Sequence, residues 1–141
     1  MRGVVRAIVV VAAIAICGCL APQNALMTSV DVQSWSKAYS LTYENSDTLS
    51  LRNLNIAVRY NDDFKARELP LKVGITTPDA RHFEEEITLQ INHPRTAPMA
   101  TTTESLPYRS KVVLAQKGGY IFAFTPLTEV RGVEAIGVEV K

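Results

Sequence analysis

Apolar and polar residues alternate along three stretches of the chain, at residues 39–43, 54–60 and 69–75. In the first stretch, polar residues separate Tyr39, Leu41 and Tyr43, and the other two stretches repeat this period of two. Such a period places apolar side chains on one face of a strand and polar side chains on the other. The pattern predicts antiparallel strands that have one face in water.

The stretch from Phe83 to Ile91 fits two periods. Its apolar residues suit a helical face, and they also suit a strand face on which Glu85 is the misfit. Thr88 and the isoleucines favour a strand, and Pro94 closes the run. We therefore expect a strand here, with a helix as the alternative.

The segments that follow are a predicted loop and a predicted hairpin. Residues His93 to Pro107 include three prolines and few apolar side chains, so we expect a long loop. Residues 112–114 and 120–124 then flank Lys117-Gly118-Gly119. Paired glycines tolerate the positive φ of tight turns, which predicts a hairpin whose second strand ends at Pro126.

A last short strand is expected over Ile136–Val140. The total is about seven short strands, with no convincing long helix beyond the N-terminal segment. This pattern favours an all-β fold, an antiparallel β-sandwich of the immunoglobulin-like kind, with a β-barrel as the alternative.

The N-terminal segment has the layout of an export signal. Met1 to Arg6 carries two arginines, and an unbroken apolar run from Ala7 to Ile16 follows and ends in small residues. A membrane-spanning helix is the alternative, but it needs about 20 apolar residues, and this run is shorter unless Arg6 is included.

The run ends in Ile16-Cys17-Gly18-Cys19, which resembles the bacterial lipobox. Cys19 fits that pattern because a small residue precedes it, whereas lipidation of Cys17 would place Ile16 directly before the cut. We expect residues 1–18 to be a lipoprotein signal peptide and Cys19 to be the lipidation site. Residues 19–34 would hold the lipidated cysteine and a linker, and residues 35–141 the β-sandwich domain, tethered to the membrane by acyl chains such as palmitate.

Charge and cysteine content narrow the function. The chain has 15 basic and 14 acidic residues, and removal of Arg2 and Arg6 with the signal peptide leaves 13 against 14. A nearly neutral domain with scattered basic residues lacks the electrostatic footprint of nucleic-acid binding. Both cysteines, Cys17 and Cys19, precede the predicted domain, so we expect no disulfide within it.

Histidines and acidic clusters are the candidates for a metal site. His82 and His93 have no further ligand at a metal-like spacing, so both are interpreted as surface histidines. Adjacent carboxylates on a strand point to opposite faces, so Glu84-Glu85-Glu86 is interpreted as a charge cluster that is solvated or protects a sheet edge. Asn61-Asp62-Asp63 resembles part of a calcium loop but is better explained as a turn. We expect no metal and no cofactor.

The sequence contains no recognisable set of catalytic residues. No serine lies in a Gly-x-Ser-x-Gly motif, and no nucleophile pairs with a base on sequence grounds, so an enzyme is not expected. Trp35 with Tyr39, Tyr43 and Tyr108 would suit a sugar-stacking platform, but core packing is the preferred interpretation of this single tryptophan.

Four segments together resemble the gliding motility lipoprotein H (GldH) family of the Bacteroidetes. They follow one another in order over most of the chain after Cys19: Asp31–Trp35, Asn53–Asn61, Gly119–Phe122 and Gly132–Lys141. The resemblance implies an accessory lipoprotein of the gliding and associated protein secretion machinery, with no catalytic residues to carry over. A glycan- or peptide-binding lipoprotein of the outer membrane is the alternative.

The expected location is the periplasmic side of the outer membrane. By the same resemblance, residues 20–24 lack the acidic cluster that marks surface-exported lipoproteins in Bacteroidetes. Envelope proteins are the expected partners. The strand that carries Glu84–Glu86 and the loop from His93 to Pro107 are the expected contact region, because strand edges and exposed loops can accept a partner.

Overall fold

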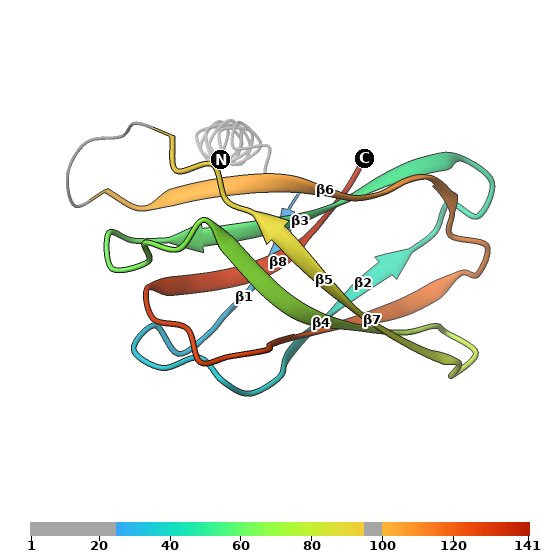
Figure 1. Cartoon of the computed structure of the whole chain (residues 1–141). Coiled ribbons are helices and arrows are strands. Elements are labelled where there is room, and N and C mark those ends of the chain that lie inside the picture. Colours follow the sequence, from blue (N-terminus) through green and yellow to red (C-terminus); the bar gives the residue numbers. More distant parts are fainter. Residues whose placement is uncertain (1–24, 95–99) are drawn as a thin grey trace, which may run out of the picture.

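The computed structural model describes residues 25–94 and 100–141, and within them the chain forms two four-stranded antiparallel sheets (Figure 1). One sheet has the strand order β1-β8-β3-β6, and the other has the order β2-β7-β4-β5. Because buried side chains of both sheets form one apolar cluster between them, the predicted all-β sandwich is confirmed. The strands are β1 (Ala25–Ser29), β2 (Tyr39–Asn45), β3 (Leu51–Tyr60), β4 (Glu68–Thr76), β5 (His82–Gln90), β6 (Thr102–Val113), β7 (Gly118–Pro126) and β8 (Val133–Val140).

The strand order is that of a jelly roll. Among the described strands, β4 and β5 are the one consecutive pair that is hydrogen-bonded, and every other connection crosses from one sheet to the other. Eight strands in this arrangement form two Greek keys. The immunoglobulin-like expectation is refined by this finding, because the first two strands of that fold pair with each other.

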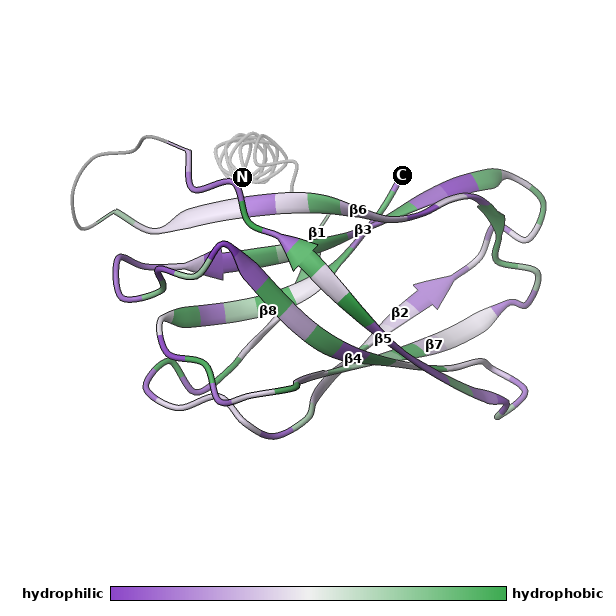
Figure 2. Cartoon of the chain, viewed as in Figure 1, coloured by the Kyte–Doolittle hydropathy of each residue, from purple (hydrophilic) through white to green (hydrophobic). Residues whose placement is uncertain are grey.

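The strands with a period of two lie where the sequence pattern placed them. Burial alternates along β2 and β4, and Figure 2 shows the corresponding alternation of apolar and polar bands along β4. Residues 82–90 form β5, so the strand interpretation is confirmed over the helical one. Strands β3 and β8 lie in the middle of their sheet and are buried more continuously.

The linker predicted for residues 19–34 is wrong over Ala25–Ser29, which form β1 and pair with β8. The backbones approach very closely at Gly137, where an added Cβ would lie 2.0 Å from the carbonyl oxygen of Leu26. Five residues at the edge of a sheet are too few to show a clear period of two, so the sequence pattern did not reveal this strand.

The long loop predicted from His93 to Pro107 is also wrong in its second half, where β6 begins at Thr102. The threonine run favours extended backbone, because β-branched side chains suit a pleated strand. Pro107 lies opposite Asn55 on a strand that has a neighbour on one side only. An edge strand tolerates a proline, so this residue was a misleading loop signal.

The predicted hairpin between residues 112 and 124 does not form, because β6 and β7 belong to different sheets. Between them the buried side chain of Asn45 donates hydrogen bonds of 2.9 Å to the carbonyl oxygens of Leu114 and Gln116. Gly118 then has a φ of 123°. Gly118 and Gly119 therefore lie where the chain crosses from one sheet to the other. Pro126 ends β7, as predicted.

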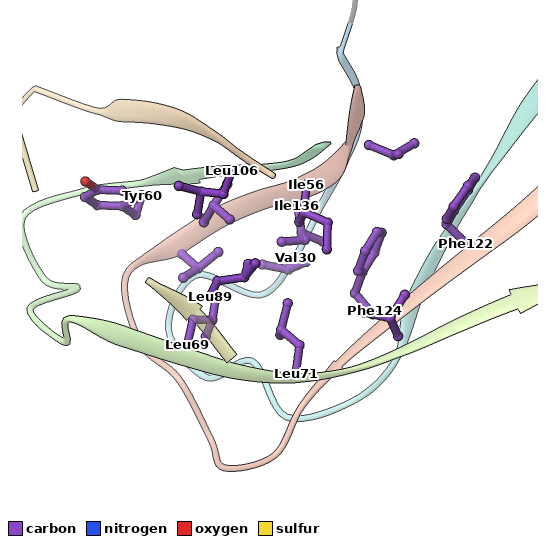
Figure 3. Close-up of a cluster of buried hydrophobic side chains, with 14 of the residues drawn as sticks. Val30, Ile56, Tyr60, Leu69, Leu71, Leu89, Leu106, Phe122, Phe124 and Ile136 are labelled. Carbon is purple, nitrogen blue, oxygen red and sulfur yellow. The ribbon is translucent and has the colours of Figure 1, made fainter. Parts of the chain in front are cut away.

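Large apolar side chains fill the space between the sheets. Trp35 is 0 % exposed, and its indole N–H donates a 2.8 Å hydrogen bond to the carbonyl oxygen of Lys37. Core packing of Trp35 is thus confirmed. Figure 3 shows side chains from both sheets that meet in this core, among them Ile56, Leu71, Phe122, Phe124 and Ile136.

One buried carboxylate, that of Glu104 in β6, joins the two sheets at one end of the sandwich. It accepts the backbone N–H groups of Asn92 at 3.0 Å and His93 at 3.1 Å, two residues that follow β5. Tyr60 of β3 donates its hydroxyl to the same carboxylate. Because β5 belongs to the opposite sheet, Glu104 fixes where the chain leaves one sheet on its way to the other.

Hydrogen bonding decides the ionisation of Glu104. Burial alone would raise its pKa, but hydrogen bonds from Tyr60, Asn92 and His93 favour the charged form and hold the pKa below its ordinary value. Burial and the neighbouring carboxylate raise the pKa of Tyr60. A carboxyl whose pKa is lower in the folded state stabilises the fold above its unfolded pKa, and this contribution is lost as pH falls through the folded pKa.

The variant Gly137→Ala is expected to be destabilised by at least about 1–3 kcal/mol, because the new methyl group collides with the backbone of β1. Urea denaturation measures the difference in the free energy of unfolding. Gly119→Ala is the matched control, because the atoms nearest its methyl group would be the side-chain ends of Thr42 and Glu44 and not backbone. Equal destabilisation of both variants would contradict the close pairing of β1 with β8.

The variant Glu104→Gln is expected to be less stable at pH 7 by about 1–3 kcal/mol, because the charged hydrogen bonds to Asn92 and His93 weaken. Its stability should also fall less than that of the wild type between neutral and acid pH, since the low-pKa carboxyl is gone. Denaturation midpoints across this pH range check both points. Glu86→Gln, an exposed change on β5, should leave the pH profile unaltered.

Candidate functional site

The two edge strands β5 and β6 face each other along one open side of the sandwich. Each belongs to a different sheet and is hydrogen-bonded to one neighbouring strand, β4 or β3. Contacts between Glu85 of β5 and Tyr108 of β6 bring the two edges together. The outer backbone groups of both strands are therefore not used by another strand of either sheet, and edges of this kind can accept an added strand.

A cleft of about 350 Å³ lies between these two edges. Phe83 is 54 % exposed at its rim, although it stands directly opposite Ile75 in the sheet and on the inward-facing side of β5. An aromatic ring left this open beside a cleft can pack against an incoming apolar side chain. The lining consists of Val73, Ile75, Phe83, Glu84, Glu85, Tyr108 and Arg109.

A cluster of Glu85, Tyr108 and Arg109 connects the two sheets at the cleft. Glu85 accepts hydrogen bonds from the Tyr108 hydroxyl and the Arg109 guanidinium group, and the Arg109 guanidinium carbon lies 5.0 Å from the centre of the Tyr108 ring. Glu85 and Tyr108 are half-buried, whereas Arg109 is exposed. The three side chains use one another's polar groups and set the spacing of the two strand edges.

These contacts change the pKa values of all three groups: the pKa of Glu85 is lowered, and those of Tyr108 and Arg109 are raised. The hydrogen bond from Tyr108, followed by that from Arg109, lowers the pKa of Glu85 despite its partial burial. Burial, together with the neighbouring Glu85 carboxylate, raises the pKa of Tyr108. The hydrogen bond to Glu85 likewise raises the pKa of Arg109. At neutral pH the site therefore contains a carboxylate, a neutral phenol and a guanidinium cation.

A second depression of about 320 Å³ lies at the end of the sandwich near Glu104. His93 stacks on Phe64 with 5.8 Å between ring centres and meets Tyr60 edge-on at 5.1 Å. Its Nε2 atom lies 2.6 Å from the carbonyl oxygen of Ala66. These contacts explain His93 as a half-buried packing residue rather than the surface residue that the sequence predicted.

The other candidates from the sequence have structural explanations. The carboxylates of Glu84 and Glu85 point to opposite faces of the edge strand β5, as predicted: Glu84 contacts His82, and Glu85 faces Tyr108. His82 is exposed, as expected for a surface histidine. In the predicted turn, Asn61 accepts the backbone N–H of Asp63 at 2.9 Å through its side chain.

The proposed sugar platform does not form around Trp35, because that side chain is fully buried. Tyr39 and Tyr43 pack against the core, and Tyr108 lies in the cleft instead. Sequence reasoning did not bring Phe83 and Arg109 together. The sequence feature that could have indicated this contact is Glu85, a carboxylate on an otherwise apolar strand face. A carboxylate that faces inward requires a polar partner, which here comes from across the sandwich.

The part of the chain that the structure describes contains neither a cluster of metal-binding side chains nor a helix suited to crossing a membrane. Across residues 25–94 and 100–141, no group of three or more His, Cys, Asp or Glu side chains is placed to hold a metal ion. The same part of the chain has no helix of the length and apolarity that a membrane crossing requires. The predicted signal peptide and Cys19 lie outside the described residues.

Comparisons with known proteins place the chain in a family. Among solved structures it is similar to a chain in the structure of infectious bursal disease virus Gx strain, with a TM-score of 0.33 and 9 % sequence identity. That match covers 82 % of this chain and spans 30 % of the viral chain. No curated protein gave a significant match. The family model described as GldH lipoprotein matches residues 25–140, from the first residue of β1 to the last of β8, and the chain therefore belongs to the GldH lipoprotein family.

Proposed function

We propose that this protein is a non-enzymatic accessory component of a gliding motility or associated protein secretion machinery, and that it acts by protein contact from a lipid anchor in the outer membrane. The family assignment supports a gliding-associated lipoprotein that is held in the envelope by its lipid. The open side of the sandwich supports the contact role. A partner segment would add to the edge of β5 and place an apolar side chain in the cleft beside Phe83.

The exposed edge at Phe83 is the observation that carries this proposal. Backbone groups along an edge strand give affinity to an added strand, and a side-chain pocket beside the edge gives specificity. The cleft supplies such a pocket, with Val73 and Ile75 at its base and Phe83 at its rim. Glu84 and Glu86 are exposed on β5 and hinder pairing of this strand with a second copy of itself, because like charges would face one another.

The ionisation states in the cleft support a non-enzymatic role. A general acid or base works best with a pKa near the operating pH. Glu85 has a pKa below its ordinary value, and the pKa of Tyr108 lies above its ordinary value, so neither exchanges protons readily at neutral pH. The cluster is suited to holding the two sheet edges at a fixed spacing.

The variant Phe83→Ser is expected to lose partner capture by about tenfold or more, because the removed ring would otherwise be buried against the partner. The measurement is quantitative cross-linking in intact cells, followed by purification of the full-length protein from solubilised envelopes. Ile121→Ser is the matched control, since Ile121 is also an exposed apolar residue of a strand, at 41 %, but lies outside the cleft.

Equal capture by Phe83→Ser and the wild type would refute the contact role of the cleft. Saturable binding of polysaccharide to the purified protein, abolished by Phe83→Ser, would instead favour the glycan-binding alternative. Denaturation curves for both serine variants show whether any loss arises from unfolding.

Lipidation at Cys19 is expected to give a mature N-terminus that carries acyl chains, because Gly18 precedes the cysteine at the cut. Mass spectrometry of the purified protein measures this modification, and Cys19→Ser should abolish it while Cys17→Ser leaves it intact. Protease added to whole cells should leave the domain uncut if it faces the periplasm. Removal of the domain by external protease would contradict the periplasmic orientation.

A further inference from the structure

Three exposed apolar side chains gather at the end of the sandwich opposite Glu104. Leu51 of β3 and Val113 of β6 are direct cross-strand partners, so they project from the same face of the sheet. Leu49 precedes them in the connection from β2 to β3 and is 87 % exposed, while Leu51 is 66 % and Val113 is 44 % exposed. We call these three residues the apolar apex.

Side-chain hydrogen bonds hold the backbone of the turn that carries Leu49. The Asp47 carboxylate accepts the backbone N–H groups of Leu49 at 3.0 Å and Ser50 at 3.1 Å, which fixes the turn that presents Leu49. Arg52 lies 3.9 Å from Asp47 and donates a 2.8 Å hydrogen bond to the Tyr43 hydroxyl. The leucine is therefore held outward by a defined turn and is not folded back onto the domain.

The chain enters the domain from this same end. Ala25, the first residue of β1, stands opposite Glu139, which in turn stands opposite Asn55 of β3. Leu51 is four residues from Asn55 towards the apex end, a distance of about 14 Å along an extended strand. Strand β1 runs away from the apex, so its first residue, Ala25, is the one nearest the apex.

The connection from Cys19 to Ala25 is short. It contains six residue steps, which span at most about 20 Å when fully extended. An acyl group on Cys19 in a bilayer would hold the apex end of the domain against the membrane surface. The opposite end, where β3, β5 and β7 end, would then point away from the membrane.

The chemistry of the apex end suits a lipid surface. Lys111 and Lys117 are exposed there, on β6 and in the connection that follows it, and the Lys141 side chain is 54 % exposed beside the last residues of β8. Apolar side chains flanked by lysines are typical of protein surfaces that enter the headgroup region of a membrane.

We propose that the apolar apex of Leu49, Leu51 and Val113 docks into the interface of the lipid bilayer that carries the acyl anchor. The inference rests on the proposed lipidation of Cys19. Docking at this point would fix the orientation of the domain, with the long axis of the sandwich directed away from the membrane and the cleft beside Phe83 open to the side.

A depth measurement on the lipidated full-length protein tests this proposal. Once the signal peptide is removed and Cys19 is acylated, the chain has no other cysteine, so Leu49→Cys accepts a single environment-sensitive fluorophore. The labelled protein is reconstituted in vesicles of phosphatidylethanolamine and phosphatidylglycerol that contain lipids with a nitroxide on the acyl chain. Leu127→Cys is the matched control, because Leu127 is a leucine that is 45 % exposed at the opposite end.

Quenching of the label at position 49 should exceed that at position 127 several-fold. Addition of Leu51→Asp and Val113→Asp should bring the label at position 49 down to the level of the control. Equal quenching at the two positions on vesicle-bound protein would overturn the docking proposal. Energy transfer between labels at position 49 on neighbouring copies, without quenching by lipid, would also overturn it and indicate a contact between copies.

Failure of the underlying lipidation is distinguishable from failure of docking. Without an acyl group on Cys19, mass spectrometry would show an unmodified N-terminus, and the wild-type protein would not float with the vesicles. With an acylated N-terminus and flotation intact, the quenching ratio reports on the apex alone. Circular dichroism of the aspartate variant confirms that its β-structure is retained.

Discussion

Burial of the inner faces of the two sheets against each other is the interaction on which the rest of this domain depends. Nearly every connection in the described chain crosses from one sheet to the other, so hydrogen bonding between consecutive strands organises little of the fold. The apolar residues around Trp35, Phe122 and Phe124 pack strands of the two sheets against each other. Because this packing is non-directional, polar contacts are needed to specify how the sheets align.

Two carboxylates provide that specification on the open side of the sandwich. Glu104 joins β6 to the residues after β5 at one end, and Glu85 joins β5 to Tyr108 and Arg109 near its other end. Both are charged groups that have enough hydrogen-bond donors to offset their partial burial. The cleft lies beside Glu85, on the side away from Glu104, with Phe83 at its rim.

The sequence predicted those parts of the fold in which one strand face is apolar and the other polar. Leu69, Leu71 and Val73 show that period, so the class of fold and several strands followed from it. The period is weak in β1, and the threonines and Pro107 of β6 lie on an edge, where propensity signals for strand and loop overlap. Contacts between segments that are distant in the sequence leave no local pattern. The one sign of the cleft in the sequence was Glu85, which did not fit the apolar face of its strand.

The position of β8 between β1 and β3 has a consequence for how the protein reaches its folded state. Its residues Val133–Val140 are the last strand described, yet they occupy the middle of a sheet. A chain delivered through a translocation channel from its N-terminus cannot close that sheet until these residues have emerged. The nascent domain would stay unfolded throughout its passage, which keeps it in the state that such a channel accepts, and would then fold in one late step.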